Sequence, residues 1–189
     1  MSSHHIVREK QEPALLVLGL NHFTEDELGQ LLEWSPTLIA TPPVAEQLTV
    51  YGIKIDYVIA DDATEITQSD VKIINPDGKT WLQAALAQLV AQAYPAVNVV
   101  TDEFDLQAYE VYAGQINMVI FYNKQKVYAI SSGFRKWKPA GEVINILTPG
   151  IELQTEGLIA IAPQQYQTAN DGFFSVKFDD DQFFIAENY

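Results

Sequence analysis

The chain has 189 residues, 48% of them hydrophobic, and a formal net charge of −14. That length suits one large domain or two small ones. The surplus of 25 acidic over 11 basic side chains disfavours nucleic acids and anionic membranes as partners, because phosphate backbones are bound through Lys and Arg. The absence of cysteine excludes disulfides, thiol nucleophiles and thiolate metal sites.

The beginning of the chain carries no sign of membrane insertion or secretion. Residues 1–12 are polar and lack the apolar stretch of a secretory signal, so we expect a disordered leader. No apolar run approaches the roughly 18 residues that a membrane-spanning helix needs. We therefore expect the protein in the cytoplasm, with no membrane partner.

The next hundred residues predict alternating strands and helices. An apolar run over 13–20 predicts a strand, and Thr24 with Glu27 forms a capping-box pattern for a helix reaching Trp34. Pro42 opens a second helix that Gly52 ends. The remaining elements are strands over 37–40, 57–60, 71–75 and 96–100, and an amphipathic helix over 80–94. This alternation indicates βαβ units around a mostly parallel sheet over residues 13–113.

The pattern changes after Gly114, where no long helical period occurs. Residues 116–122 and 126–130 have the spacing of a hairpin. Further strand-like segments cover 142–147, 157–161, 172–178 and 182–186. The sequence therefore predicts two domains, an α/β domain over 13–113 and an antiparallel β-sandwich over 114–189.

Several acidic residues follow predicted strands. Asp61 and Asp62 come directly after a buried strand, where ligands gather in open α/β sheets, although a solvated strand end is an equal interpretation for Asp61. Asp62 and Asp77 also suit turns. The acids in 101–105 are either metal ligands or a solvated loop, and those in 179–181 predict a hairpin turn.

The order of these segments and one motif resemble the thiamine pyrophosphokinase family. Residues 52–56, Gly-Ile-Lys-Ile-Asp, stand before a hydrophobic strand and Asp61, where the family has Gly-Ile-x-Pro-Asp, a strand and Gly-Asp-Phe-Asp-Ser. Residues 77–80 resemble the beginning of its Asp-Gln-x-Thr-Asp motif. Residues 117–130 resemble its first sandwich hairpin, and 155–158 its Thr-x-Gly-Leu.

The resemblance implies a function and a set of site residues. Members of the family transfer pyrophosphate from ATP to thiamine with Mg²⁺, and they are typically homodimers whose site lies between the α/β domain of one subunit and the sandwich of the other. Carried over by position, Asp61 and Asp62 would be catalytic and Asp61 and Asp77 would hold the metal. Asp77 and Thr80 would bind the nucleotide, and Trp137 and Asn170 would bind thiamine.

The departures from the family pattern fall on the catalytic residues. The second acid of Gly-Asp-Phe-Asp-Ser is Ala63, and the second acid of the next motif is Trp81. The family's Gly-Gly-Arg-x-Asp-His has no counterpart. We therefore predict a pyrophosphokinase-like protein with weakened or lost transfer and retained binding of thiamine or a nucleotide. An active enzyme using Asp61, Asp62 and Asp77, and a non-enzymatic dimeric scaffold, are the alternatives.

Overall fold

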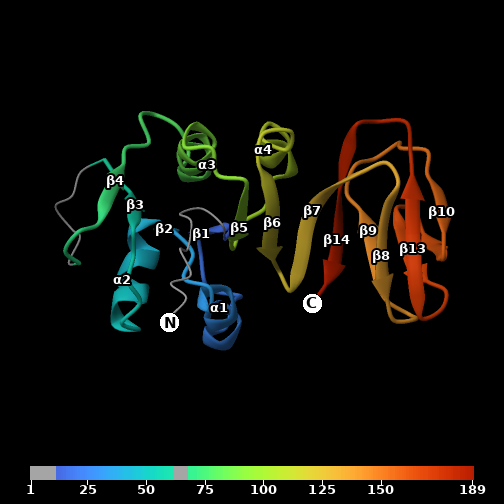
Figure 1. Cartoon of the computed structure of the whole chain (residues 1–189), viewed down its shortest axis with the longest axis horizontal. Coiled ribbons are helices and arrows are strands. Elements are labelled where there is room, and N and C mark those ends of the chain that lie inside the picture. Colours follow the sequence, from blue (N-terminus) through green and yellow to red (C-terminus); the bar gives the residue numbers. More distant parts are fainter. Residues whose placement is uncertain (1–11, 62–67) are drawn as a thin grey trace, which may run out of the picture. The chain divides into compact units, whose positions relative to one another are not determined.

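A computed structural model of the chain describes residues 12–61 and 68–189. The chain divides into two compact units, one ending at Met118 and the other beginning at Val119 (Figure 1). In the part of the chain that the structure describes, no helix is long and apolar enough to cross a membrane.

The first unit is a parallel sheet with helices between its strands. In chain order its elements are β1 (Ala14–Val17), α1 (Glu25–Leu32), β2 (Leu38–Ala40), α2 (Pro42–Val50), β3 (Tyr57–Ile59), β4 (Lys72–Ile74), α3 (Trp81–Ala91), β5 (Ala96–Val100) and α4 (Leu106–Glu110). The strand order is β5-β1-β2-β3-β4, and all these pairs are parallel. Every residue of β1 and β2 is buried, as expected for central strands of a parallel sheet. The α/β prediction for this part of the chain is confirmed.

The chain reverses its direction across the sheet once. From β1 it moves through β2 and β3 to β4, and α3 then returns it to β5 on the other side of β1. Because strand–helix–strand crossovers are right-handed, this reversal places α3 on the face opposite α1 and α2 (Figure 1). The carboxyl ends of β1 and β5 therefore flank the topological switch point, where α/β proteins bind ligands.

Local signals set most helix ends. Capping boxes begin α1 at Thr24 and α3 at Thr80, and Gly52 ends α2 with a φ of +71°. The helix predicted over 80–94 is shorter, because Ala93 adopts a left-handed φ of +57° and ends it. The short helix α4 was not predicted.

The second unit consists of two antiparallel sheets. Its strands are β6 (Asn117–Tyr122), β7 (Gln125–Ser131), β8 (Phe134–Lys138), β9 (Val143–Ile146), β10 (Gln154–Glu156), β11 (Leu158–Ala162), β12 (Gln165–Thr168), β13 (Gly172–Lys177) and β14 (Gln182–Asn188). One sheet has the order β11-β12-β9-β14-β7-β6, and the other has the order β10-β13-β8. The two sheets share a core that includes Ile144 and Ile185 from the first and Phe174 and Val176 from the second. The antiparallel prediction holds, although β8, β10 and β12 were not among the predicted strands.

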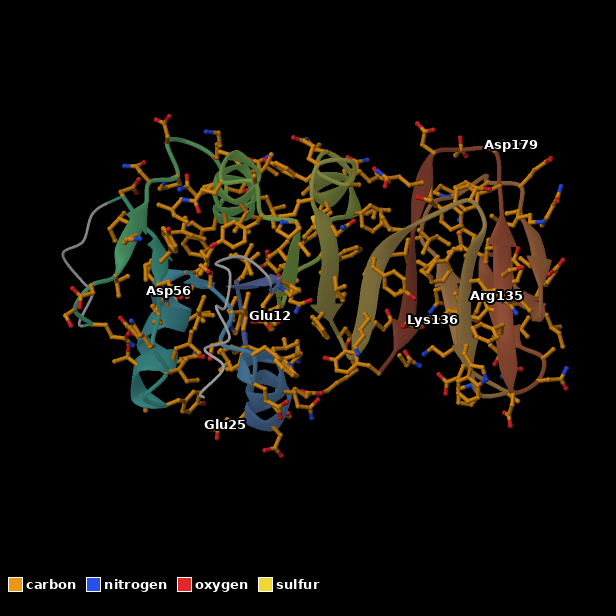
Figure 2. The ribbon with its side chains drawn as sticks, viewed as in Figure 1. Glu12, Glu25, Asp56, Arg135, Lys136 and Asp179 are labelled. Carbon is orange, nitrogen blue, oxygen red and sulfur yellow. The ribbon has the colours of Figure 1, made fainter. Side chains whose placement is uncertain are left out.

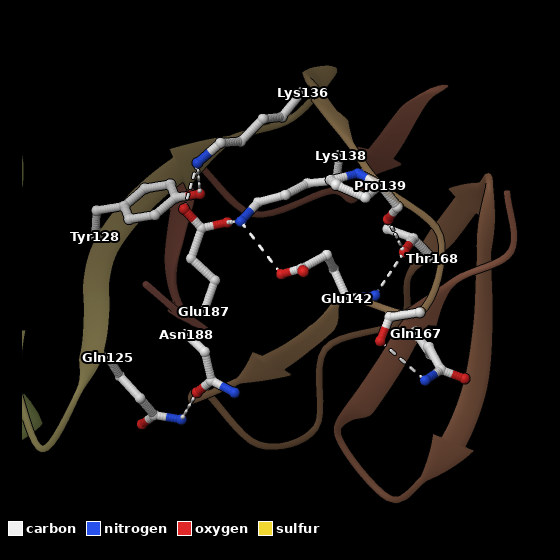
Figure 3. Close-up of polar contacts among 11 residues, drawn as sticks. Gln125, Tyr128, Lys136, Lys138, Pro139, Glu142, Gln167, Thr168, Glu187 and Asn188 are labelled. Carbon is white, nitrogen blue, oxygen red and sulfur yellow. Dashed lines mark hydrogen bonds and ion pairs between the residues drawn. The ribbon is translucent and has the colours of Figure 1, made fainter. Parts of the chain in front are cut away.

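A buried charge cluster lies among β7, β8 and β14 of this unit (Figure 3). Glu187 is 2% exposed and forms ion pairs with Lys136 and Lys138, the latter at 3.0 Å. Lys136 also donates to the hydroxyl of Tyr128 at 3.1 Å. Arg135 alternates with Lys136 along β8 and is exposed (Figure 2). The predicted turn at 179–181 joins β13 to β14 and is exposed.

Candidate functional site: a cleft at the ends of β1 and β5

A cleft of about 560 Å³ opens in the first unit at the switch point. Its walls come from the segments after β1 and β5, the first turn of α3, and α4. The lining residues are Leu18, Asn21, Thr80, Trp81, Leu82, Thr101, Asp102, Glu103, Phe104, Asp105, Ala108 and Tyr109. The volume is in the range of small-molecule pockets.

Asp102 connects the two strand ends that form the cleft. Its Oδ2 accepts a hydrogen bond from the backbone N–H of Asn21 at 3.2 Å. The carboxylate also lies so close to Gly19 that a Cβ there would be 2.1 Å from Oδ2. Gly19 therefore has no side chain because Asp102 occupies the space, and the carboxylate is fixed beside the cleft.

The neighbouring acids are held by short-range hydrogen bonds. The buried Thr101 hydroxyl donates to the carbonyl of Glu103 at 2.8 Å and accepts from its N–H at 3.2 Å. Asp105 is the N-cap of α4 and accepts from the N–H of Gln107 at 3.1 Å. The segment after β5 is thus an ordered turn that presents three carboxylates to the cleft, rather than a simple solvated loop.

Aromatic side chains form the apolar part of the wall. Trp81, the first residue of α3, is 45% exposed. Phe104 stacks on Tyr109, with ring centroids 5.5 Å apart and an interplanar angle of 19°. Tyr109 is almost fully buried, and this burial raises the pKa of its phenol, which therefore stays neutral.

The charge of the cleft has one sign. Asp102, Glu103 and Asp105 are acidic, and none of the described lining residues is Lys, Arg or His. A cavity with carboxylates and aromatic rings attracts organic cations, through Coulomb and cation–π interactions. The same carboxylates repel the phosphates of a nucleotide.

Asp61 and Asp77, predicted as metal ligands, lie in the turns after β3 and β4. Asn75 connects these turns: its Nδ2 donates to the carbonyl of Asp61 at 3.4 Å, and its Oδ1 accepts from the N–H of Asp77 at 2.8 Å. Both acids are exposed, and Asp77 has the left-handed φ of a turn residue, +49°. Asp62, with Ala63 and Thr64, lies outside the described residues.

The described side chains do not form a metal site of their own. Across residues 12–61 and 68–189, no three His, Asp or Glu side chains come together so as to hold a metal ion. Two of the three acids in the cleft already accept backbone hydrogen bonds: Asp102 from Asn21, and Asp105 from Gln107 at the beginning of α4. Among the described residues, therefore, no set of side chains holds a magnesium ion by itself.

Thr80 and Trp81 are the two positions of the family-like motif that line the cleft. The Thr80 hydroxyl accepts from the N–H of Gln83 at 3.2 Å and caps α3. Trp81, where the family motif has an acid, contributes an indole wall. Asp61 and Asp77 do not belong to the cleft lining.

Trp137 and Asn170, the residues predicted to bind thiamine, belong to the second unit. Trp137 lies on β8 directly opposite Phe173 of β13, and the two rings are 52% and 58% exposed. The Arg135 guanidinium carbon lies 4.3 Å from the centre of the Phe173 ring. Asn170 is exposed in the turn before β13. Both side chains are therefore accessible.

The sequence suggested some of these residues more clearly than others. Asp102, Glu103 and Asp105 stood out as acids after a strand, but nothing showed that α3 brings β5 next to β1. For Gly19 and Asn21, the only feature of the sequence that points to a site is their position directly after a buried strand. The meeting of Asp102 with Gly19, 83 positions earlier in the chain, is a property of the tertiary structure.

The fold of this chain is similar to that of solved thiamine pyrophosphokinases. A solved thiamine pyrophosphokinase from Bacillus subtilis aligns with 94% of this chain and 99% of its own, with a TM-score of 0.68 and 12% identity. The thiamin pyrophosphokinase of Geobacillus thermodenitrificans aligns with 93% of this chain and 97% of its own, with a TM-score of 0.71 and 10% identity. The Candida albicans thiamin pyrophosphokinase reaches a TM-score of 0.65 at 12% identity, over 94% of this chain and 89% of its own.

The likeness lies in the fold rather than the sequence. No protein-family model and no curated protein sequence matches the chain. The resemblance inferred from the order of motifs is confirmed at the level of fold: this chain has the architecture of thiamine pyrophosphokinases at 10–15% identity.

Proposed function

We propose that this thiamine pyrophosphokinase-like protein binds thiamine or a closely related organic cation in the cleft of its first unit, and that pyrophosphate transfer is weak or lost. The observation that carries the proposal is the composition of the cleft. Three carboxylates and two exposed or half-buried aromatic rings line it, and no described basic side chain does.

The charge of the cleft opposes catalysis of pyrophosphate transfer. Such a reaction depends on cationic groups and metal ions that stabilise negative charge on the phosphates. Here Asp102, Glu103 and Asp105 would face those phosphates instead. Removing one strong electrostatic contributor commonly lowers a rate by about 10²–10³, and this chain lacks several of them.

The same composition favours thiamine. Its thiazolium ring carries a positive charge and its pyrimidine ring is planar, so carboxylates and aromatic faces complement both. Trp81 is exposed enough to stack on one ring, and Asp102 is fixed by Asn21 and close to the cleft. Trp137 and Asn170 remain predicted contacts, and the homodimer and the cytoplasmic location remain predictions from the sequence.

An active Mg²⁺-dependent enzyme is the main alternative. Asn75 connects the turns that carry Asp61 and Asp77, and Thr80 lines the cleft, so these positions remain available to a Mg·ATP complex that brings its own phosphate and water ligands. This alternative requires AMP formation. The proposed function requires thiamine binding without it.

Titration calorimetry with thiamine and with Mg·ATP, together with an assay for AMP, distinguishes these functions. Heat from thiamine without AMP supports the proposal, and AMP produced at enzymatic rates supports the active alternative. If neither compound produces heat and no AMP forms, the non-enzymatic scaffold is the remaining alternative.

A matched pair of variants locates the site. Asp102→Asn removes one negative charge from the cleft while its amide oxygen still accepts from Asn21. We expect thiamine affinity to fall about tenfold or more, as for loss of a charge-assisted contact. Glu110→Gln removes the same charge from an exposed position of α4 outside the cleft lining, and it should leave the affinity unchanged. Equal affinities for both variants would contradict the proposed location.

A further inference from the structure

The three carboxylates of the cleft differ in the contacts that they already make. Asp102 accepts a hydrogen bond from the N–H of Asn21, and Asp105 accepts one from the N–H of Gln107. Within the part of the chain that the structure describes, the side chain of Glu103 forms no hydrogen bond and no ion pair. Of these three acids, Glu103 therefore offers a ligand a charge that no protein donor has partly neutralised.

The backbone of Glu103 is fixed, although its side chain is free. The hydroxyl of Thr101 donates to the carbonyl of Glu103 at 2.8 Å and accepts from its N–H at 3.2 Å. The next residue, Phe104, also lines the cleft and stacks on the buried Tyr109. The Glu103 carboxylate thus extends from an ordered turn beside an aromatic wall. An aromatic cation that lies against this wall can bring its positive charge to Glu103.

A phosphate group would find few partners in the same cleft. None of the described lining residues is Lys, Arg or His. The beginning of α3 could attract an anion through its backbone N–H groups, but its capping box already uses two of them. The N–H of Thr80 donates to the side chain of Gln83 at 3.1 Å, and the N–H of Gln83 donates to the hydroxyl of Thr80 at 3.2 Å. A phosphate in the cleft would therefore face the carboxylates with little compensation.

We propose that the cleft binds thiamine in preference to its phosphate esters, and that Glu103 determines this specificity. The inference rests on the proposed function, since it concerns the same cleft. A phosphate monoester adds roughly 1.5 to 2 negative charges at pH 7, which outweigh the positive charge of the thiazolium ring. With three carboxylates around one cleft, Coulomb repulsion in a solvent-like dielectric gives a preference of about tenfold or more for thiamine.

Charge rather than size makes this selection. The cleft volume of about 560 Å³ lies in the range that holds drug-sized molecules, so there is room for thiamine and its monophosphate alike. The selected ligand keeps the free hydroxyl that a phosphoryl- or pyrophosphoryl-transfer reaction consumes. The protein therefore holds the substrate of such a reaction and rejects its product.

Titration calorimetry of the full chain with three ligands tests the specificity. Thiamine monophosphate should bind about tenfold or more weakly than thiamine, and added NaCl should reduce this ratio, because salt screens the repulsion. The acetate ester of thiamine lengthens the same arm without adding a charge, so its affinity should be close to that of thiamine. If the acetate ester is rejected as strongly as the monophosphate, size makes the selection and the proposal is wrong.

Substitutions at Glu103 test its role, with the same substitutions at Glu110 as controls. Glu103→Gln should lower the preference for thiamine, and Glu103→Lys should bring the two affinities close to equality, because it reverses the charge. Glu110 lies outside the cleft lining, so Glu110→Gln and Glu110→Lys should keep the wild-type ratio. Circular dichroism checks that each variant is folded.

The outcomes separate this inference from the proposed function. If the wild type binds thiamine and its monophosphate equally, or if folded Glu103→Lys keeps the wild-type ratio, the inference is wrong and thiamine binding still stands. If the wild type does not bind thiamine at all, both are wrong.

Discussion

The carboxylate of Asp102 occupies the space beside the Cα of Gly19. A Cβ on Gly19 would lie 2.1 Å from Oδ2 and 2.6 Å from Cγ of Asp102. The two residues follow the neighbouring parallel strands β1 and β5, and Asp102 also lines the cleft. Glycine at position 19 is therefore required by a close approach, not by an unusual φ.

The first prediction concerns this contact. Gly19→Ala should displace Asp102 and destabilise the fold by about 1–3 kcal/mol, the range for overpacking. Gly29→Ala is the control: Gly29 is exposed within α1 with nothing within 4 Å of a Cβ, so alanine should stabilise by about 0.5–1 kcal/mol. Urea unfolding of both variants measures whether each substitution lowers or raises the free energy of unfolding. A neutral Gly19→Ala would show that Asp102 can move freely.

The second prediction concerns two helix ends with the same hydrogen bonds. At the end of α2, the N–H of Gly52 donates to the carbonyl of Thr49 and the N–H of Ile53 to that of Leu48. At the end of α3, the N–H of Ala93 donates to the carbonyl of Val90 and the N–H of Tyr94 to that of Leu89. Gly52 and Ala93 both have a left-handed φ, which glycine adopts without strain. Ala93→Gly should therefore raise the unfolding free energy by about 1 kcal/mol, and Gly52→Ala should lower it by a similar amount. Thermal unfolding measures both, and shifts of the same sign would contradict the interpretation.

The third prediction concerns the buried Glu187. It pairs with Lys136 and Lys138, so Glu187→Gln removes the buried carboxylate from both lysines and leaves only Lys138 with a second partner, Glu142. The variant should lower the unfolding free energy by about 3 kcal/mol. Glu142→Gln is the matched control. Its carboxylate is 37% exposed and 3.7 Å from Lys138, so it should change stability by less than about 1 kcal/mol.

The pH dependence of the same cluster is the fourth prediction. Burial would raise the pKa of Glu187, but Lys136 and Lys138 outweigh it and hold the pKa below its ordinary value of 4.5. The stabilisation is therefore complete above pH 4.5 and is lost as pH falls through the lower pKa of the folded state. The difference in unfolding free energy between wild type and Glu187→Gln should be constant near neutral pH and narrow below pH 4.5. A difference independent of pH would show that Glu187 contributes no titrating charge.

The fifth prediction uses tryptophan fluorescence to follow thiamine. The chain has three tryptophans, and Trp81 is the one in the cleft. Thiamine should quench the wild type, and Trp81→Phe should abolish most of this quenching. Trp34→Phe, at a position 71% exposed, should retain it. If Trp137→Phe abolishes the quenching instead, thiamine binds to the second unit.

Local sequence signals determined the ends of several elements. The Thr24–Glu27 capping box and the Gly52 stop appear as expected, because each depends on residues a few positions apart. The same locality explains two errors. Ala93 ends α3 in a conformation that alanine disfavours, and the polar strand β12 lacks the apolar alternation that marks a strand.

The sequence by itself determined the class of fold: the alternation of apolar segments with capped helices, followed by strands without helical periods, identified an α/β part and an antiparallel part. Only the tertiary structure decided the cleft, because the return of α3 places β5 beside β1 and so brings Asp102 to Gly19. It also decided which side chains of β8 are exposed, with Trp137 outward and Lys136 against Glu187. Hydrophobic pattern and capping act over a few residues, whereas strand order is set by packing between segments far apart in the chain.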